Sequence, residues 1–197
     1  MIVSKADPSS QRKERNKTIR WVVTIFVATI FISGLISFAS DAIMASSTMF
    51  VAFVILLAIV LIGIIFDVVG VAVTSADEKP FHSMAARKVP GAQEAIRLLR
   101  NAERVSSICN DVVGDICGVV SGSASATIAV QVIRDFDFSW PQIVSLLMSS
   151  LAAGLTVGGK AIGKTFAVNS CTEIVHTVGR LIYGLRHFPK IFGKKKK

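Results

Sequence analysis

The sequence predicts an all-α integral membrane protein, and two properties of the whole chain support this prediction. Of its 197 residues, 52% are hydrophobic and the mean hydropathy is +0.61, which is more apolar than an ordinary soluble domain. Four apolar runs are also long enough to cross a bilayer as helices. The net charge of +9 does not indicate nucleic-acid binding, because the basic residues flank these runs instead of alternating with aromatic residues.

The first two predicted spans lie in the N-terminal part of the chain. The first runs from Trp21 to about Ala39 and follows six basic residues within positions 1–20. This pattern also describes a signal peptide, but a run of about 19 residues exceeds a typical signal core and no A-x-A cleavage motif ends it. We therefore expect a retained helix. The second span runs from about Met49 to Val73.

Two further spans follow in the second half of the chain. The third, from about Val105 to Val132, is rich in small residues that recur at every fourth position, namely Gly114, Gly118, Gly122 and Ala126. Such spacing lets helix backbones approach closely, within one subunit or across a dimer. The fourth span is predicted from Pro141 to about Gly159, where glycines obscure its end.

The distribution of basic residues predicts the orientation in the membrane. Of the 22 Lys and Arg residues, six precede the first span, six lie between the second and third, and nine lie from Lys160 onward. Only Arg134 remains for the two loops on the opposite side, 40–47 and 134–139. By the positive-inside rule, both termini and the loop 74–104 are cytoplasmic, as expected for a multi-pass protein of the cell membrane.

The segments outside the spans also carry patterns. In the loop 74–104, Pro80 and Pro90 predict the starts of two short helices, the second continuing into the third span. After Asn169, apolar and basic residues recur at helical spacing, which predicts an amphipathic helix on the inner membrane surface, attracted to anionic lipids. The tail Lys194 to Lys197 extends this attraction, although four lysines alone also fit a purification or export remnant. The predicted regions are 1–20, 21–48, 49–168 and 169–197.

Ionisable residues in three spans fall at similar depths. Asp67 lies roughly 27 Å from the outer start of its span, and Asp111 and Asp115 lie roughly 9 and 15 Å from the cytoplasmic start of theirs. Lys160 is again near the cytoplasmic side. A charge in hydrocarbon costs at least about 2.5–3.5 kcal/mol, so such groups normally face one another or a cavity. Carboxylate oxygens would suit Mg²⁺, whereas an ion pair between Lys160 and an aspartate would only lock the helices together. Spacing alone favours neither alternative.

Several motifs resemble those of a known family. The stretch FDVVGVAVTSADEKPF is similar to the family motif F-S-G-x-E-x-A, and AIRLLRNAERV to a basic loop with A-x-x-L-L-x-x-x-E-R before an asparagine-containing helix. From Gly159, GKAIGKTFAVN is similar to G-E-x-x-P-K-T-x-A. In this order and spacing, over roughly residues 50–190, these motifs resemble the transmembrane domain of the cyclin-M/CorB/CorC magnesium transporters.

The resemblance implies a fold and a site. It implies a homodimer with three helices per subunit, a juxtamembrane belt helix and a dehydrated Mg²⁺ in an inward-facing cavity, the first span being an addition. The cytoplasmic nucleotide-binding domains of full-length members have no counterpart in this sequence. The family's ligand positions correspond to Asp67, Val69, Asn110, Asp111, Gly114 and Lys160. Lys160 replaces the family's glutamate and Asp67 its first motif serine, while Gly70 and Gly163 replace a motif glutamate and proline.

Two functions follow as hypotheses. In the first, the protein binds or transports a divalent cation such as Mg²⁺ through an acidic cavity. The predicted ligands are Asp67, Asn110, Asp111, Gly114 and Asp115, with Lys160 as an internal counter-ion. In the second, Lys160 replaces the ion, and the protein is a transport-incompetent scaffold or a subunit of a membrane partner, since an ammonium group repels a divalent cation.

An enzyme is not expected. The three histidines, His82, His176 and His187, lie in loop or surface segments without a nucleophile and an acid at a catalytic spacing. The sequence also has no phosphate-binding glycine loop and no cluster of zinc ligands. The three cysteines, Cys109, Cys117 and Cys171, form no close pair and are expected to be reduced packing residues.

Overall fold

The computed structural model describes residues 8–45, 47–136 and 140–192, and the regular structure within them is entirely helical. The elements are α1 (Pro8–Ala45), α2 (Met49–Ser75), α3 (Lys79–Ala86), α4 (Ala92–Arg100), α5 (Ala102–Ser107), the π-helix η1 (Ile108–Gly114), α6 (Asp115–Phe136), α7 (Pro141–Asn169) and α8 (Cys171–Phe192). Four helices are long and apolar enough to span a membrane: α1, α2, the continuous α5–η1–α6, and α7. The prediction of an all-α membrane protein is therefore confirmed.

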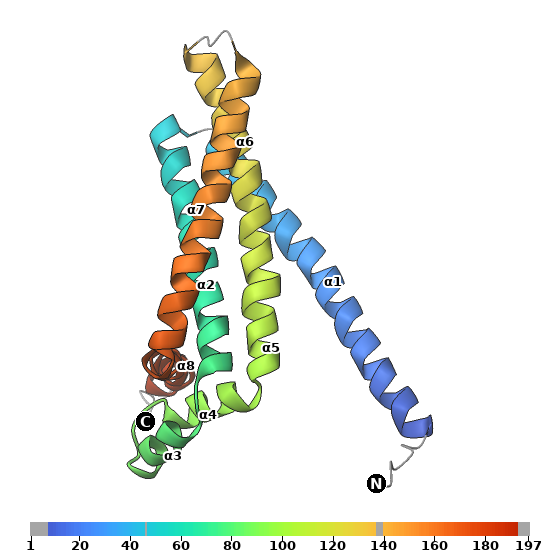
Figure 1. Cartoon of the computed structure of the whole chain (residues 1–197), viewed down its shortest axis with the longest axis vertical. Coiled ribbons are helices and arrows are strands. Elements are labelled where there is room, and N and C mark those ends of the chain that lie inside the picture. The colour runs from blue at the N-terminus through green and yellow to red at the C-terminus, as the bar shows by residue number, and fades with distance from the viewer. Residues whose placement is uncertain (1–7, 46, 137–139, 193–197) are drawn as a thin grey trace.

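Helices α2, α6 and α7 form a three-helix bundle (Figure 1). Helix α1 contacts α6 near one end and then diverges from the bundle, so that it exposes most of its apolar residues. Helices α3, α4 and α8 gather at the opposite end of the bundle, which we call the basal end. The end that holds the α6–α7 connection is called the upper end.

Three sequence predictions about helix boundaries are wrong. The fourth span does not end near Gly159, because α7 continues through Gly163 to Asn169. These glycines pack against α2, where a Cβ at Gly163 would lie 2.7 Å from Val68 Cγ2. Helix α4 does not continue into the third span, because Asn101 leaves the helical conformation with φ −117° and ψ 28°. Residues 40–45, predicted as loop, belong to α1.

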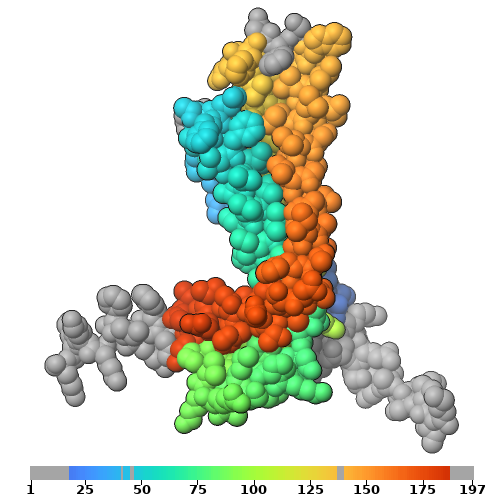
Figure 2. Space-filling view, turned by 60° about the vertical axis from the view of Figure 1, so that its left-hand side comes forward, coloured from blue at the N-terminus to red at the C-terminus, as the bar shows by residue number. Residues whose placement is uncertain are grey.

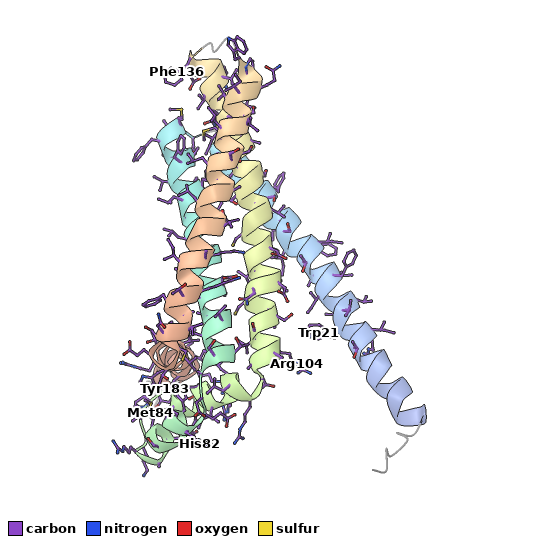
Figure 3. All side chains as sticks on the ribbon, in the orientation of Figure 1. Trp21, His82, Met84, Arg104, Phe136 and Tyr183 are labelled. Atoms are coloured by element: carbon purple, nitrogen blue, oxygen red, sulfur yellow. The ribbon has the colours of Figure 1, made fainter. Side chains whose placement is uncertain are left out.

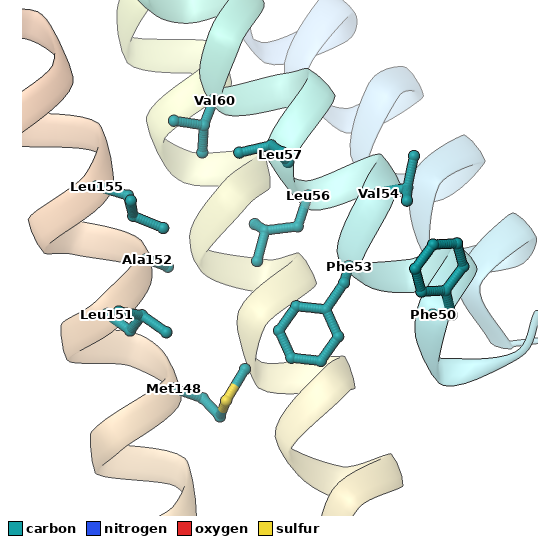
Figure 4. A pocket seen from close by; sticks show the side chains of 10 residues that line it. All are labelled: Phe50, Phe53, Val54, Leu56, Leu57, Val60, Met148, Leu151, Ala152 and Leu155. Atoms are coloured by element: carbon teal, nitrogen blue, oxygen red, sulfur yellow. The ribbon is translucent and has the colours of Figure 1, made fainter.

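The upper half of the bundle is held by apolar contacts. Its buried residues, which we call the upper cluster, are Met44, Ala52, Leu56, Val60, Ala124, Ile128 and Ala152. One buried hydrogen bond joins α1 to this half, from Gln131 Nε2 to the Met44 carbonyl oxygen at 2.9 Å. Beside the cluster, a cavity of about 300 Å³ lies between α2 and α7 and is lined by apolar side chains such as Phe53 and Leu151 (Figure 4).

The basal end has a second apolar centre. Its buried residues, the basal cluster, are Ala72, Val73, Phe81, Ala95, Leu99, Ala167 and Val175. Helix α8 is seen end-on in Figure 1. Figure 2 shows that it lies across the bundle, over the segment that contains α3 and α4. Gly91, with φ +87°, allows the start of α4 to approach the backbone of Gly179 and Arg180 in α8. The predicted amphipathic helix is thus α8, while Lys194 to Lys197 lie outside the described residues.

Candidate functional site

Asp67 is the buried carboxylate of the bundle. It lies in α2, is only 3% exposed, and faces two lysines of α7 that are one helical turn apart. Its Oδ1 is 4.0 Å from Lys160 Nζ and its Oδ2 is 3.9 Å from Lys164 Nζ. The Lys160 side chain is 20% exposed and that of Lys164 is 55% exposed. Lys160 is therefore the more enclosed of the two counter-ions.

Lys160 also links α7 to the third span. Its Nζ donates a hydrogen bond to the Gly114 carbonyl oxygen at 3.4 Å. A side chain at position 114 would crowd this contact, since a Cβ there would lie 3.2 Å from Lys160 Nζ. The lysine thus joins a carboxylate of α2 to a backbone oxygen of η1. Both oxygens belong to residues that were predicted as metal ligands.

Asn110 lies beside the same stretch of α2. Its side chain fills the space left by Gly70, where a Cβ would lie 2.8 Å from Asn110 Cγ. Asn110 Nδ2 donates a hydrogen bond to Ser106 Oγ at 3.2 Å, whereas its Oδ1 is buried without a hydrogen-bond donor. Asp67 Oδ2 is likewise buried without a hydrogen bond. The bundle therefore holds one carboxylate oxygen and one amide oxygen with unused acceptor capacity.

The remaining predicted ligands lie elsewhere. Asp111 is exposed and accepts a hydrogen bond from Ser107 Oγ at 2.8 Å. Asp115 is also exposed. Among the residues that the structure describes, no group of three or more His, Cys, Asp or Glu side chains could hold a metal ion. The structure thus brings together Asp67, Gly114 and Lys160, places Asn110 one turn away, and leaves the other two aspartates outside.

These residues do not fit a divalent cation as they are arranged. One carboxylate faces two ammonium groups, which leaves an excess of positive charge where Mg²⁺ would have to bind. The Gly114 oxygen is already bonded to Lys160. A cation could enter only if the Lys160 side chain moved away.

Sequence reasoning missed two features of this site. Lys164 was not predicted as a counter-ion, although its spacing of four residues from Lys160 places both on one face of a helix. The π-helix η1 was also not predicted. Insertions of this kind frequently occur at functional sites, and η1 carries Asn110 and Gly114. No local sequence pattern predicts this π-helix.

Comparisons with known proteins identify no relative. No family profile matches the chain, and no similar curated protein or solved structure was found. The resemblance to the cyclin-M/CorB/CorC transporters therefore rests on the sequence motifs alone and stays a prediction.

Proposed function

We propose that the chain is a membrane subunit in which Lys160 takes the place of a bound cation, so that it does not transport Mg²⁺ and acts through a membrane partner. The observation that supports this proposal is the position of Lys160 Nζ, 4.0 Å from Asp67 Oδ1 and 3.4 Å from the Gly114 oxygen. A tethered ammonium group supplies the positive charge that a cation would otherwise supply. The three spans around it are then joined permanently.

The proposal includes the family likeness and the membrane orientation. A cyclin-M-like core implies a homodimer in the cell membrane with the basal end in the cytoplasm. The orientation is supported by the basic residues of the basal end, including the exposed Arg87, Lys88 and Arg100, because cytoplasmic loops carry an excess of Lys and Arg. A second copy or another membrane protein would be the partner.

Binding of a divalent cation is the second candidate function. It is favoured by the two buried acceptors without hydrogen bonds, Asp67 Oδ2 and Asn110 Oδ1. In this case Lys160 would act as a gate that withdraws when the cation enters. The two candidates differ in whether the contact between Lys160 and Asp67 is permanent.

Mg²⁺ uptake into proteoliposomes that contain a fluorescent magnesium indicator separates the candidates. We expect the native protein to show no uptake above protein-free liposomes. Uptake by the native protein that is abolished by Asp67→Ala would contradict the proposal and support transport. Asp115→Ala is the matched control, because it removes an exposed carboxylate from a neighbouring span. The Lys160→Glu variant shows whether an acidic residue at this position restores uptake.

A further inference from the structure

A polar hollow lies at the corner between α4 and α5. Its volume is about 450 Å³, and it is lined by Leu99, Arg100, Asn101, Ala102, Glu103 and Arg104. The corner exists because Asn101 interrupts the helix, where its Nδ2 donates a hydrogen bond to the Arg97 carbonyl oxygen at 2.9 Å. Arg100 and Arg104, four residues apart, therefore line one hollow at the start of a candidate membrane span.

The two arginines of the hollow have no acidic partner among the described residues. By contrast, Arg97 and Arg186 both lie within 4.0 Å of Glu94, and Arg134 contacts Asp135. Glu103 belongs to the hollow, but no ion pair joins it to Arg100 or Arg104 in the part of the chain that the structure describes. The hollow thus carries a net positive charge and unused hydrogen-bond donors.

The hollow lies at the level expected for lipid headgroups. The candidate membrane span Ala102–Phe136 begins within it, and the exposed Asp111 and Asp115 of the following turns place the hollow on the polar side of the apolar part of the bilayer. Figure 3 shows Trp21 of α1 at about the same height as Arg104 along the bundle. Tryptophan is enriched at the membrane–water interface, so Trp21 is an independent marker of this level. The anionic group available to exposed guanidinium groups at this height is a lipid phosphate.

We propose that this hollow binds the phosphate group of an anionic phospholipid. Arg100 and Arg104 donate hydrogen bonds to the phosphate oxygens in the manner typical of guanidinium groups. The acyl chains extend along the third span towards its exposed apolar residues, such as Ile108 and Val119. The inference is independent of the proposed function, since it concerns neither Lys160 nor Asp67.

The test uses the full chain in a neutral detergent, with bound lipid counted by native mass spectrometry. The probe is dioctanoyl phosphatidylglycerol, and zwitterionic dioctanoyl phosphatidylcholine is the comparison lipid. The site variant is Arg100→Gln with Arg104→Gln. The matched control is Lys79→Gln with Arg87→Gln, which removes the same charge from exposed basal positions outside the hollow.

We expect the site variant to bind phosphatidylglycerol about 30-fold more weakly than the native protein, from an attraction of about 1 kcal/mol per basic residue near an anionic surface. The control variant and the native protein should bind it alike, and both should prefer it to phosphatidylcholine. Equal losses in both variants, or no loss in the site variant, would overturn the proposal. Displacement of the lipid by an equal concentration of inorganic phosphate would also overturn it, because a soluble phosphate would then be the ligand.

Discussion

The upper cluster and the basal cluster contain similar numbers of buried residues but differ in their surroundings. Each cluster has seven buried residues, three of them alanines, but the upper cluster lies between membrane spans. In a bilayer no hydrophobic force drives such helices together, so close packing must hold them. The basal cluster joins α2, α7 and α8 to α3 and α4, which lie beyond the ends of the spans. Withdrawing Phe81 and Leu99 from water stabilises it through the hydrophobic effect.

The contact between Asp67 and Lys160 lies between these two clusters and is stabilised by a third kind of interaction, the attraction of opposite charges. Neither packing nor the hydrophobic effect accounts for a carboxylate that is 3% exposed. It is tolerated because cations face it, since an unpaired charge in this position would be costly. One bundle is therefore stabilised by different forces at different depths. Substitutions at each depth should therefore have different effects.

The largest effect is expected for Asp67→Asn, which keeps the shape of the side chain and removes its charge. Lys160 then loses its carboxylate, and the free energy of unfolding should fall by about 3–5 kcal/mol. Denaturant titration in mixed micelles measures it. Asp115→Asn is the isosteric control and should leave stability unchanged, because Asp115 is exposed. Equal stabilities of the two variants would show that the contact between Asp67 and Lys160 does not stabilise the bundle.

A similar or slightly smaller loss is expected for Phe81→Ala in the basal cluster. Phe81 is fully buried, and truncation of a buried phenylalanine typically costs about 3–5 kcal/mol. Phe50 is 77% exposed, and Phe50→Ala should change the unfolding free energy by less than about 0.5 kcal/mol. Denaturant titration in mixed micelles compares the two variants. Equal losses of stability in Phe81→Ala and Phe50→Ala would show that burial of Phe81 does not stabilise the basal cluster.

An intermediate loss is expected for Gly91→Ala at the contact between α4 and α8. Gly91 has φ +87°, and a Cβ there would lie 2.7 Å from the Arg180 Cα. Strain of this kind costs about 1–3 kcal/mol. Gly184→Ala, where nothing lies within 4 Å, should be neutral or stabilising by up to about 1 kcal/mol. Trypsin cleavage within 74–104 provides the local measurement and should accelerate only in Gly91→Ala.

The smallest effect is expected for Glu94→Gln. Glu94 Oε1 is 3.7 Å from Arg97 Nη1 and 3.9 Å from Arg186 Nη1, but both arginine side chains are 61% exposed. Glu94 is itself buried, but its two arginine partners are largely in solvent, so we expect the pairs to contribute about 1 kcal/mol and to weaken with salt. The difference from the native protein should therefore shrink between low and high salt. A loss that is large and independent of salt would instead show that solvent does not screen the contacts of Glu94.

The sequence predicted those features that depend on continuous apolar runs. The second span begins at the predicted Met49 and ends only two residues after the predicted Val73. Features that depend on contacts between spans could not be predicted. Gly159 looked like a helix end because its packing against Ile64 is invisible in the sequence. Similar depths suggested that Asp67, Asp111 and Lys160 meet, but depth does not determine the helix face. The π-helix η1 also changes the facing of residues within the third span.

The most direct test of the central claim is a distance measurement between Lys160 and Asp67 in lipid. Solid-state NMR can detect the dipolar coupling between ¹⁵Nζ of lysine and the ¹³C-labelled carboxyl group of aspartate, with Lys160→Met identifying the relevant signal. If Lys160 replaces a bound cation, this coupling should be present and unchanged when millimolar Mg²⁺ is added. A coupling that disappears on addition of Mg²⁺ would mean that the ion displaces the lysine, and would contradict the proposed function.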